Sequence, residues 1–327
     1  MLAIGLTDHL EGPPDQPSGS IFAEVGALVE RADRLGVAYA WFAEHHAHAH
    51  HGHLPTPLLY ALHLAGRTRS IRLGTAVICL NLRHPLDVAE QVATADALAG
   101  GRLAVGFGSG STPVEFALFD RAVTAEAERH AQFRTSLQSI RAAWDGTSDP
   151  PLLPRPDPDL AGRCWLAVNS AGSARIAGEL GFNMLYSHLR TPAQYREYRA
   201  AYRDAGGRGL VAANRPVYVG ADDDAAFAEA GPALRALWRR FRAEGKIPAA
   251  TPEPADPADL TGHPINFLVG GPESVAGQVA ELRAAAPFDV LNVEVRWAGL
   301  SAAQVRASLD RLMGEVVPRL DLSPQPA

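Results

Sequence analysis

Short runs of apolar and β-branched residues alternate along the chain with longer stretches in which apolar residues recur every three or four positions. The short runs predict buried strands, and the longer stretches predict amphipathic helices, as at 22–35, 84–98 and 124–144. Eight strands are predicted, at residues 2–6, 39–43, 71–78, 102–106, 164–168, 184–186, 216–219 and 290–295. This alternation is typical of a parallel sheet covered by helices. It predicts an α/β fold, a single (β/α)8 TIM barrel spanning residues 1–327.

Two proline-rich stretches interrupt this pattern, each with five prolines. The first, 149–162, precedes the fifth predicted strand on the face of a barrel that lies away from the chemistry, so a structural loop is expected. The second, 246–264, follows the seventh predicted strand on the opposite face. It predicts a lid-like insertion over a bound ligand, with a disordered loop as the alternative.

Composition restricts the class of protein. The net charge of −6 comes without a dense cluster of lysine or arginine, so nucleic acid is not an expected partner. No apolar run reaches 18 residues, which predicts a cytoplasmic protein that does not enter a membrane. The one lysine, Lys246, lies in a proline-rich loop, so Schiff-base chemistry has no candidate. Cys79 and Cys164 lie in apolar runs and are expected to be buried, inert thiols.

The ends of the predicted strands carry most of the candidate chemistry, because barrel active sites are built at the C-terminal ends of strands. Nearly all of these ends are polar or rich in glycine. In strand order they carry Thr7, Asp8 and His9; Glu44, His45 and His46; the loop 106–112; Asn169 and Ser170; Ser187 and His188; Asp222; and Glu294 and Arg296. Any one of them could be a helix cap or a solvated residue. Their coincidence on so many strands predicts an active site.

A phosphate site is predicted where the fifth strand leads into a helix. Asn169, Ser170 and Ser173 bring hydroxyls and backbone N–H groups to that helix N-terminus, beside the glycine loop that follows the fourth strand. Serine is also a common helix cap, so capping alone is an alternative explanation. A second candidate is Gly270-Gly271 before Pro272, although glycines before a helix start are ordinary.

Six of the twelve histidines lie between His45 and His53, which raises the question of a metal. His46, His48, His50 and His53 could supply enough imidazoles for zinc. Barrel metallohydrolases, however, typically carry a His-x-His pair on the first strand and another histidine on the fifth. The fifth strand here ends in Asn169, so a solvated histidine loop is the preferred interpretation and no metal is expected.

Several motifs occur together in one order across nearly the whole chain. They are Trp41-Phe42-Ala43-Glu44-His45-His46, Pro55-x-Pro57, Ile71-Arg72-Leu73-Gly74-Thr75-Ala76-Val77, His84-Pro85-Leu86 with Ala89-Glu90-Gln91, Gly101-Arg102-Leu103 with the glycine loop, and Gly270-x-Pro272-Glu273. Each motif is weakly specific, but the ordered set resembles the bacterial-luciferase-like, flavin-dependent monooxygenases.

The resemblance implies a barrel that holds reduced FMN at its C-terminal mouth. By similarity, His45 matches the catalytic histidine beside the flavin, and Glu44 is its orienting neighbour. The family's non-proline cis peptide would fall at Ala76-Val77. Flavin contacts are further expected from Gly108, Ser109, Asn169, Ser170, Ser173 and Ser187. Asp8, His46, Phe107 and His188 are expected to contact the substrate.

One position departs from the family pattern. Many members carry an arginine in the loop after the fourth strand as a charge partner for the FMN phosphate, and this chain has Ser109 there. A serine donates a hydrogen bond but no charge, so Arg175 on the adjacent helix is a possible substitute. In having a serine at this position, the chain also resembles relatives that bind a deazaflavin and transfer hydride.

The resemblance therefore implies a two-component monooxygenase, in which a separate reductase supplies reduced FMN and O2 oxygenates a small organic substrate. The chain has no complete Gly-x-Gly-x-x-Gly nucleotide motif after a strand, in keeping with an external reductase. A deazaflavin-dependent oxidoreductase is the alternative, followed by a metallohydrolase and a catalytically silent flavin-binding relative. A homodimer through the region of 84–98 is implied by the resemblance only, while Val88, Val92 and Ala95 are expected to pack on the barrel.

Overall fold

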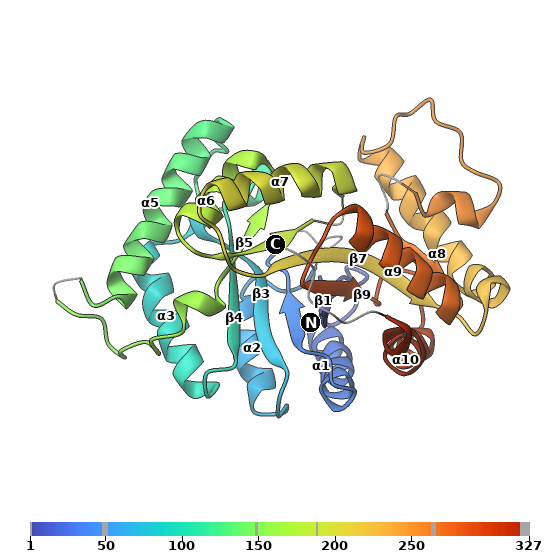
Figure 1. The fold of residues 1–327 in the computed structure, drawn as a ribbon, viewed down its shortest axis with the longest axis horizontal. Helices are drawn as coiled ribbons and strands as arrows, with labels where there is room; N and C mark the ends of the chain where they lie inside the picture. Colours follow the sequence, from blue (N-terminus) through green and yellow to red (C-terminus); the bar gives the residue numbers. More distant parts are fainter. Residues whose placement is uncertain (1, 48–51, 148–149, 188, 263–265, 321–327) are drawn as a thin grey trace.

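A computed structural model describes residues 2–47, 52–147, 150–187, 189–262 and 266–320. Eight parallel strands form a closed ring in which each strand pairs with its neighbours and β9 returns to β1. The ring strands are β1 (Ala3–Asp8), β2 (Tyr39–Phe42), β3 (Arg72–Cys79), β4 (Leu103–Gly108), β5 (Trp165–Val168), β6 (Asn183–Tyr186), β7 (Val211–Val219) and β9 (Val290–Glu294). Figure 1 shows the strands at the centre with helices outside them. The predicted (β/α)8 barrel is confirmed.

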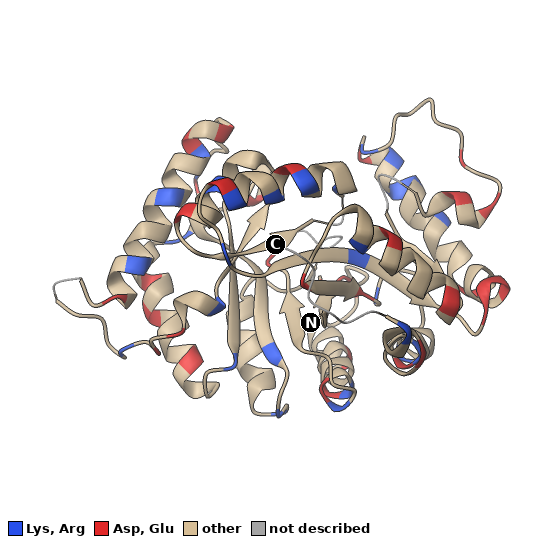
Figure 2. Cartoon of the chain, in the orientation of Figure 1, with Lys and Arg blue, Asp and Glu red and all other residues tan. Residues whose placement is uncertain are grey.

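Helices follow the strands in sequence and cover the barrel. They are α1 (Ser18–Arg34), α2 (Pro57–Ala65), α3 (Pro85–Leu98), α4 (Pro113–Ala117), α5 (Glu126–Trp144), α6 (Ala171–Glu179), α7 (Pro192–Asp204), α8 (Asp223–Ala243), α9 (Pro272–Ala285) and α10 (Ala302–Arg311). Charged residues lie mainly on these helices and their loops, whereas the strands carry few of them (Figure 2). On α3, Val88, Val92 and Ala95 are buried, as predicted. Among the described residues, no helix is both long and apolar enough to cross a membrane.

The seventh strand differs from the prediction. The run 216–219 is only the second half of β7, and the segment that completes the ring is Val211–Arg215, which pairs with β6 and β9. The half at Val217–Val219 pairs instead with β8 (Leu268–Gly270), a ninth strand that lies outside the ring. Asn214 is therefore the polar residue that this strand brings to the ring. Asp222, predicted as a strand-end residue, instead accepts a hydrogen bond from the N–H of Ala225 and caps α8.

Alternation along β4 decides which of its residues face the barrel interior. A Cβ atom at Gly106 would lie 2.2 Å from the carbonyl oxygen of Thr75, and one at Gly108 would lie 2.4 Å from Cγ2 of Val77. These glycines therefore face the crowded interior. Phe107, between them, points outward because successive side chains in a strand alternate. It is fully buried against Trp144 and Phe182.

The insertion between β7 and β9 comprises α8, a proline-rich loop, the 3-10 turn Pro257–Leu260, β8 and α9. It has a second apolar core of its own, in which Trp238, Phe241 and Phe267 are buried with Trp297. The insertion stands beside the ring at one side of the molecule (Figure 1). The predicted lid-like insertion is thus a folded unit built on a helix, in addition to the loop that the sequence indicated.

Candidate active site

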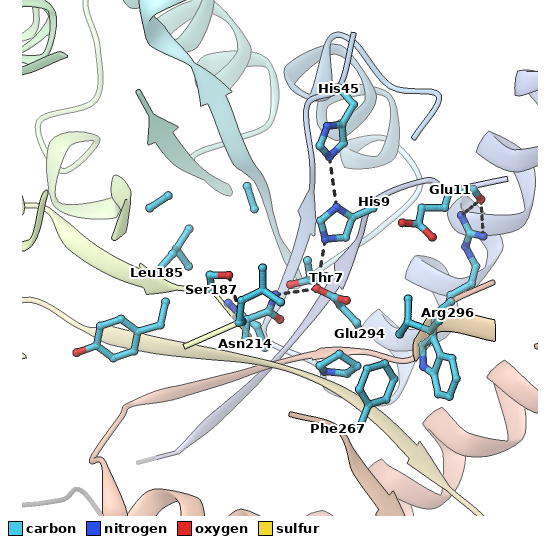
Figure 3. A pocket seen from close by; sticks show the side chains of 18 of the residues that line it. Thr7, His9, Glu11, His45, Leu185, Ser187, Asn214, Phe267, Glu294 and Arg296 are labelled. Carbon is cyan, nitrogen blue, oxygen red and sulfur yellow. Dashed lines mark hydrogen bonds and ion pairs between the residues drawn. The ribbon is translucent and has the colours of Figure 1, made fainter. Parts of the chain in front are cut away.

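A cavity of about 300 Å3 lies at the C-terminal ends of the ring strands. This is the lower end of the size range of small-molecule sites. Of the residues expected to act on flavin or substrate, it is lined by His45, Ala76, Val77, Asn169 and Ser187. Thr7, His9, Asn214 and Glu294 line it as well, and they lie close together in Figure 3. The cavity is the place where the predicted chemistry can meet.

His45 is held by a carboxylate, but not by the expected one. Its Nδ1 lies 3.2 Å from Oε1 of Glu115, a residue of the short helix α4 that follows β4. The same oxygen accepts a bond from the backbone N–H of His46 at 3.1 Å. Burial would raise the pKa of Glu115, but these hydrogen bonds outweigh burial and hold it below its usual value. An ionised Glu115 therefore fixes the His45 ring.

Glu44 serves a different purpose from the one predicted. Its carboxylate lies 2.9 Å from Nε2 of His46 and 3.0 Å from Arg83, and its side chain is only 1% exposed. Neither Glu44 nor His46 is among the residues that line the cavity. Side chains of adjacent residues at a strand end point in different directions, so Glu44 cannot follow His45 into the mouth. The structure places Glu44 in a buried ion pair with His46 and Arg83, outside the cavity lining.

A second imidazole lies beside His45. Nδ1 of His9 is 3.5 Å from Nε2 of His45, and Nε2 of His9 is 3.3 Å from Oε1 of Glu294 (Figure 3). Asn214 donates its amide N–H to the same Glu294 oxygen at 2.8 Å. Burial opposes a charge on His9, but the nearby carboxylates Glu294, Glu11 and Asp8 outweigh it and raise the pKa of His9 to about 9.

Asp8, expected at the substrate, is taken up by a neighbouring arginine. Its two oxygens accept hydrogen bonds from Nε and Nη2 of Arg296 at 3.0 and 3.1 Å, and the pair is almost fully buried at the aspartate. Arg296 lines the cavity and Asp8 does not. A bidentate pair of this kind fixes the arginine in place. Asp8 thus acts on the cavity from behind its lining, by positioning Arg296 and by raising the pKa of His9.

One wall of the cavity is the β3 segment Ala76-Val77, whose peptide bond is cis, as the resemblance implied. Gly108 on the neighbouring strand packs against the side chain of Val77. Any larger residue in place of Gly108 would collide with Val77. Gly108 therefore shapes this wall from behind, and it is not itself part of the cavity lining. Ser109 follows in the same loop and does not line the cavity either.

The N-terminus of α6 adjoins the cavity at Asn169. Ser170 and Ser173 form a capping box, in which the Ser170 hydroxyl accepts from the N–H of Ser173 and the Ser173 hydroxyl accepts from the N–H of Ser170. The two serines are therefore helix caps, as the alternative explanation held. The predicted phosphate site would lie at the same helix N-terminus. A Cβ atom at Gly172 would lie 3.3 Å from Nδ1 of His130 on α5, so an imidazole stands over this helix end.

The competing phosphate position at Gly270-Gly271 is already occupied by the chain itself. The N–H of Gly271 donates to Oδ1 of Asp223 at 2.6 Å, and the hydroxyl of Ser274 donates to the same carboxylate at 2.7 Å. These bonds hold the pKa of Asp223 below its usual value. An aspartate in the anion position excludes a phosphate there, and β8 lies outside the ring.

Helix α8 and the residues after it close the cavity on one side. Leu237, Arg240, Phe241 and Lys246 all line the cavity. Arg240 reaches across to Glu11, which follows β1, with a shortest N–O distance of 3.3 Å. Lys246, excluded on sequence grounds as a loop residue, lies in the wall and pairs with Glu244 at 2.7 Å.

Some predictions fall partly or wholly outside the described residues. His188, expected at the substrate, and His48, His50 and His51 of the histidine run are among them. Within the described ranges, no three His, Cys, Asp or Glu side chains are grouped in a way that could hold a metal ion. His53, which is described, accepts or donates a bond at 3.0 Å to the hydroxyl of Ser18, away from the cavity.

Comparison with known proteins agrees with this geometry. A family model described as luciferase-like monooxygenase matches residues 4–288. The chain belongs to the luciferase-like monooxygenase family. It is therefore an oxidoreductase, in keeping with relatives that are named monooxygenases.

Two kinds of relative stand out within the luciferase-like family. The oxygenase component of a flavin-dependent trigonelline monooxygenase from Acinetobacter baylyi is 24% identical over 97% of this chain and 95% of its own. An F420-dependent glucose-6-phosphate dehydrogenase from Amycolatopsis mediterranei is 34% identical over 36% of each chain. The relatives thus include both a flavin-dependent monooxygenase and an F420-dependent dehydrogenase.

Solved structures share the fold of this family member over its whole length. The monooxygenase RslO1 from Streptomyces bottropensis aligns with a TM-score of 0.82 and 24% identity, covering 97% of this chain and 99% of its own. The oxygenating constituent of 3,6-diketocamphane monooxygenase from Pseudomonas putida, solved with FMN, aligns with a TM-score of 0.80 and 18% identity over 98% and 99%. At these identities the likeness concerns the fold.

Sequence reasoning missed Glu115 and Asn214, and it assigned no role to His9 and Glu294. His9 and Glu294 carried a usable signal, since each stands at a strand end. Asn214 was hidden because the wrong half of β7 was taken as the ring strand. Glu115 lies seven residues beyond β4, in a helix of its own, and nothing in the sequence connects it with His45.

Proposed function

We propose that this protein is the oxygenase of a two-component system, which uses reduced FMN and O2 to oxygenate a small organic substrate. The observation that carries the proposal is the cavity at the barrel mouth, where His45 and the Ala76-Val77 wall share one space beside the N-terminus of α6. The trigonelline relative, named an oxygenase component, and the FMN complex of the diketocamphane enzyme support the flavin and the external reductase.

The residues present fit FMN. The flat, apolar wall formed by Ala76, Val77 and Leu185 suits an isoalloxazine ring, with Asn169 and Ser187 as polar partners at its edge. The phosphate would be held at the α6 N-terminus, where the first N–H groups of a helix favour an anion. Ser170 and Ser109 would donate hydroxyls there. When bound and reduced, FMN supplies the electrons that activate O2.

The protein's own residues would bind, shield and move protons. His45 would exchange a proton with the reacting centre, since an imidazole suits this task near neutral pH. Glu115 would position His45. Leu237, Phe241 and Phe267 of the insertion would exclude water from the mouth and give the substrate an apolar surface.

A deazaflavin-dependent hydride transfer is the second candidate. The observation that favours it is Ser109, at the position where an arginine would pair with the FMN phosphate. The similarity of this chain to F420-dependent proteins also supports a deazaflavin cofactor. Under this alternative the same cavity would serve a cofactor that does not activate O2.

Cofactor reconstitution and O2 uptake test the two candidates together. We expect O2 consumption by the purified protein with reduced FMN and a flavin reductase, and none with reduced F420. His45→Ala is expected to bind FMN with wild-type affinity and to lose product formation by about 100-fold or more, the usual range for general acid–base catalysis. Substrate reduction with F420 would replace the proposal by the alternative. Unchanged product formation in His45→Ala would reject the proposal that His45 is a catalytic residue.

The homodimer and the cytoplasmic location stay predictions. Leu86 and Leu98 of α3 are exposed to 48% and 69% in the single chain, and this helix is the one that the resemblance connects with dimerisation. Exposed leucines in this place support an apolar contact with a second copy.

A further inference from the structure

Four ionisable side chains from four separate segments form one line across the cavity mouth. Glu115 contacts Nδ1 of His45, Nε2 of His45 faces Nδ1 of His9, and Nε2 of His9 contacts Glu294. The two ring planes are nearly parallel, inclined by 23°, and their centroids lie 5.7 Å apart. Figure 3 shows the two histidines and Glu294 in this order.

The partners at each end determine where the protons are. Glu115 is ionised and can only accept, so Nδ1 of His45 must donate to its oxygen. Oε1 of Glu294 accepts from the amide of Asn214, so Nε2 of His9 must donate as well. Each neutral imidazole has only one N–H. With the outer nitrogens protonated, two neutral rings would turn two lone pairs toward each other at 3.5 Å.

We propose that His9 and His45 share one additional proton between their facing nitrogens and act as a single acid–base unit, with Glu115 and Glu294 as positioning residues. The unit holds three N–H protons and one positive charge. His9 is thereby a second catalytic residue of the cavity, because it lines the same space as His45.

Carboxylates from several of the described elements support a positive charge at this place. Glu294 approaches from β9, Asp8 and Glu11 from β1 and the segment after it, and Glu115 from α4. The cations that line the cavity contact other carboxylates: Arg296 contacts Asp8, Arg240 contacts Glu11 and Lys246 contacts Glu244. Glu294 and Glu115 are the carboxylates in contact with the imidazoles themselves. The resulting pKa of His9, about 9, means that the unit keeps its proton throughout the neutral range.

The use of the proton rests on the proposed function. An anion that forms at the reacting centre takes the shared proton, so that one N–H bond breaks, its electron pair stays on the ring nitrogen and a new bond to hydrogen forms on the anion. The unit is left neutral, with one N–H on each ring facing its carboxylate. Uptake of a proton from water restores it.

Nuclear magnetic resonance of the 15N-histidine-labelled protein without cofactor tests the unit directly. His9→Gln and His45→Gln assign the signals. In the wild-type protein we expect the transition of His9 near pH 9 to change the signals of the His45 ring as well, because the facing nitrogens share the proton. Glu294→Gln is expected to lower it by about one pH unit or more toward 6.5, the ordinary value for histidine, because it removes the nearest negative charge. Glu30→Gln on the outer surface is the matched control.

Independent transitions of the two rings, or a His9 transition near pH 6.5 in the wild-type protein, would overturn the proposal. This readout needs no flavin, so its failure is distinct from failure of the oxygenase proposal. In the active enzyme, His9→Gln should move the alkaline fall of kcat from near pH 9 to lower pH, because the group with the raised pKa is gone. Substrate KM should change little, because His45 and the apolar walls remain.

Discussion

His45 shows how much one residue depends on partners that are distant in the sequence. The neighbouring Glu44 is one residue away, yet Arg83 and His46 take its carboxylate. Glu115, seventy residues further along the chain, makes the contact with Nδ1. The chemistry of the imidazole is therefore set by where α4 lies after β4.

Separate replacement of Glu115 and Glu44 distinguishes the carboxylate that positions His45 from the one that pairs with His46 and Arg83. In Glu115→Gln the ring keeps a hydrogen-bonding neighbour but loses the negative charge. We expect kcat to fall about 10- to 100-fold with KM nearly unchanged, since a hydrogen bond to a charged group contributes roughly 1.5–3 kcal/mol. Stopped-flow or steady-state O2 uptake measures the loss, and the pH profile should shift with it.

Glu44→Gln is the matched variant for this comparison. It leaves Arg83 without its buried carboxylate, so we expect a lower melting temperature, because losing one partner of a buried ion pair is destabilising. Turnover per folded molecule should fall less than in Glu115→Gln. The opposite order, with Glu44→Gln folded but inactive and Glu115→Gln active, would restore the sequence-based assignment.

At the scale of elements, the barrel interior depends on close contact between β3 and β4. Gly74 and Gly106 belong to these two strands, and an added Cβ atom at either one would lie within 2.5 Å of a backbone oxygen of the other strand. Trp41 fills the space beside Gly74 and packs edge-on against Trp165, with ring centroids 5.4 Å apart, while Leu185 and Val77 lie beside Gly106. The wall that bears Ala76 and Val77 rests on this packing.

Gly106→Ala tests this contact. The methyl group would meet the Thr75 carbonyl oxygen, which the sheet holds in place, so we expect a loss of stability of about 1–3 kcal/mol, the usual range for overpacking. Urea unfolding followed by circular dichroism measures the change. Gly277→Ala on the exposed side of α9, where nothing lies within 4 Å, should be neutral or slightly stabilising. Equal stability of the two variants would contradict the prediction.

For the molecule as a whole, the two ends of the barrel respond to pH in opposite directions. At the catalytic end, the raised pKa of His9 contributes stability that is fully present below about pH 6.5 and is lost as pH rises through about 9. At the other end, Asp33 of α1 accepts the backbone N–H groups of Arg69, Ser70 and Ile71 before β3. Burial opposes its ionisation, but these bonds outweigh burial and lower its pKa to about 2.

Asp33→Asn should change how the stability of the fold depends on pH below about 4. The contribution of Asp33 is present above its unfolded pKa near 4 and is lost as pH falls toward 2. We expect the variant to melt at a lower temperature than the wild-type protein at pH 7, with the difference shrinking between about pH 4 and pH 2. Differential scanning calorimetry across this range measures it. Asp145→Asn, exposed at the end of α5, is the control, and a difference independent of pH would reject the assignment.

The sequence by itself determined the barrel, the face on which chemistry gathers and the family. Alternating apolar runs and helical periodicity report burial directly, because they follow from local geometry. Strand ends such as Asn169, Ser187 and His45 could be placed at the cavity because every strand of a parallel barrel ends on the same side. The family motifs added the cis peptide at Ala76-Val77.

Only the tertiary structure decided which strand-end residues face the cavity and which partners they have. Phe107 points away from the cavity because side chains alternate along a strand. Glu44 and Asp8 are held in ion pairs outside the cavity lining, and Asp222 caps a helix. Glu115, Asn214 and the His9–His45 contact emerged from the closure of the ring, which brings β1, β2, β7, β9 and α4 together. Such contacts depend on through-space distances between segments up to 285 residues apart, and these distances are not encoded in any local pattern.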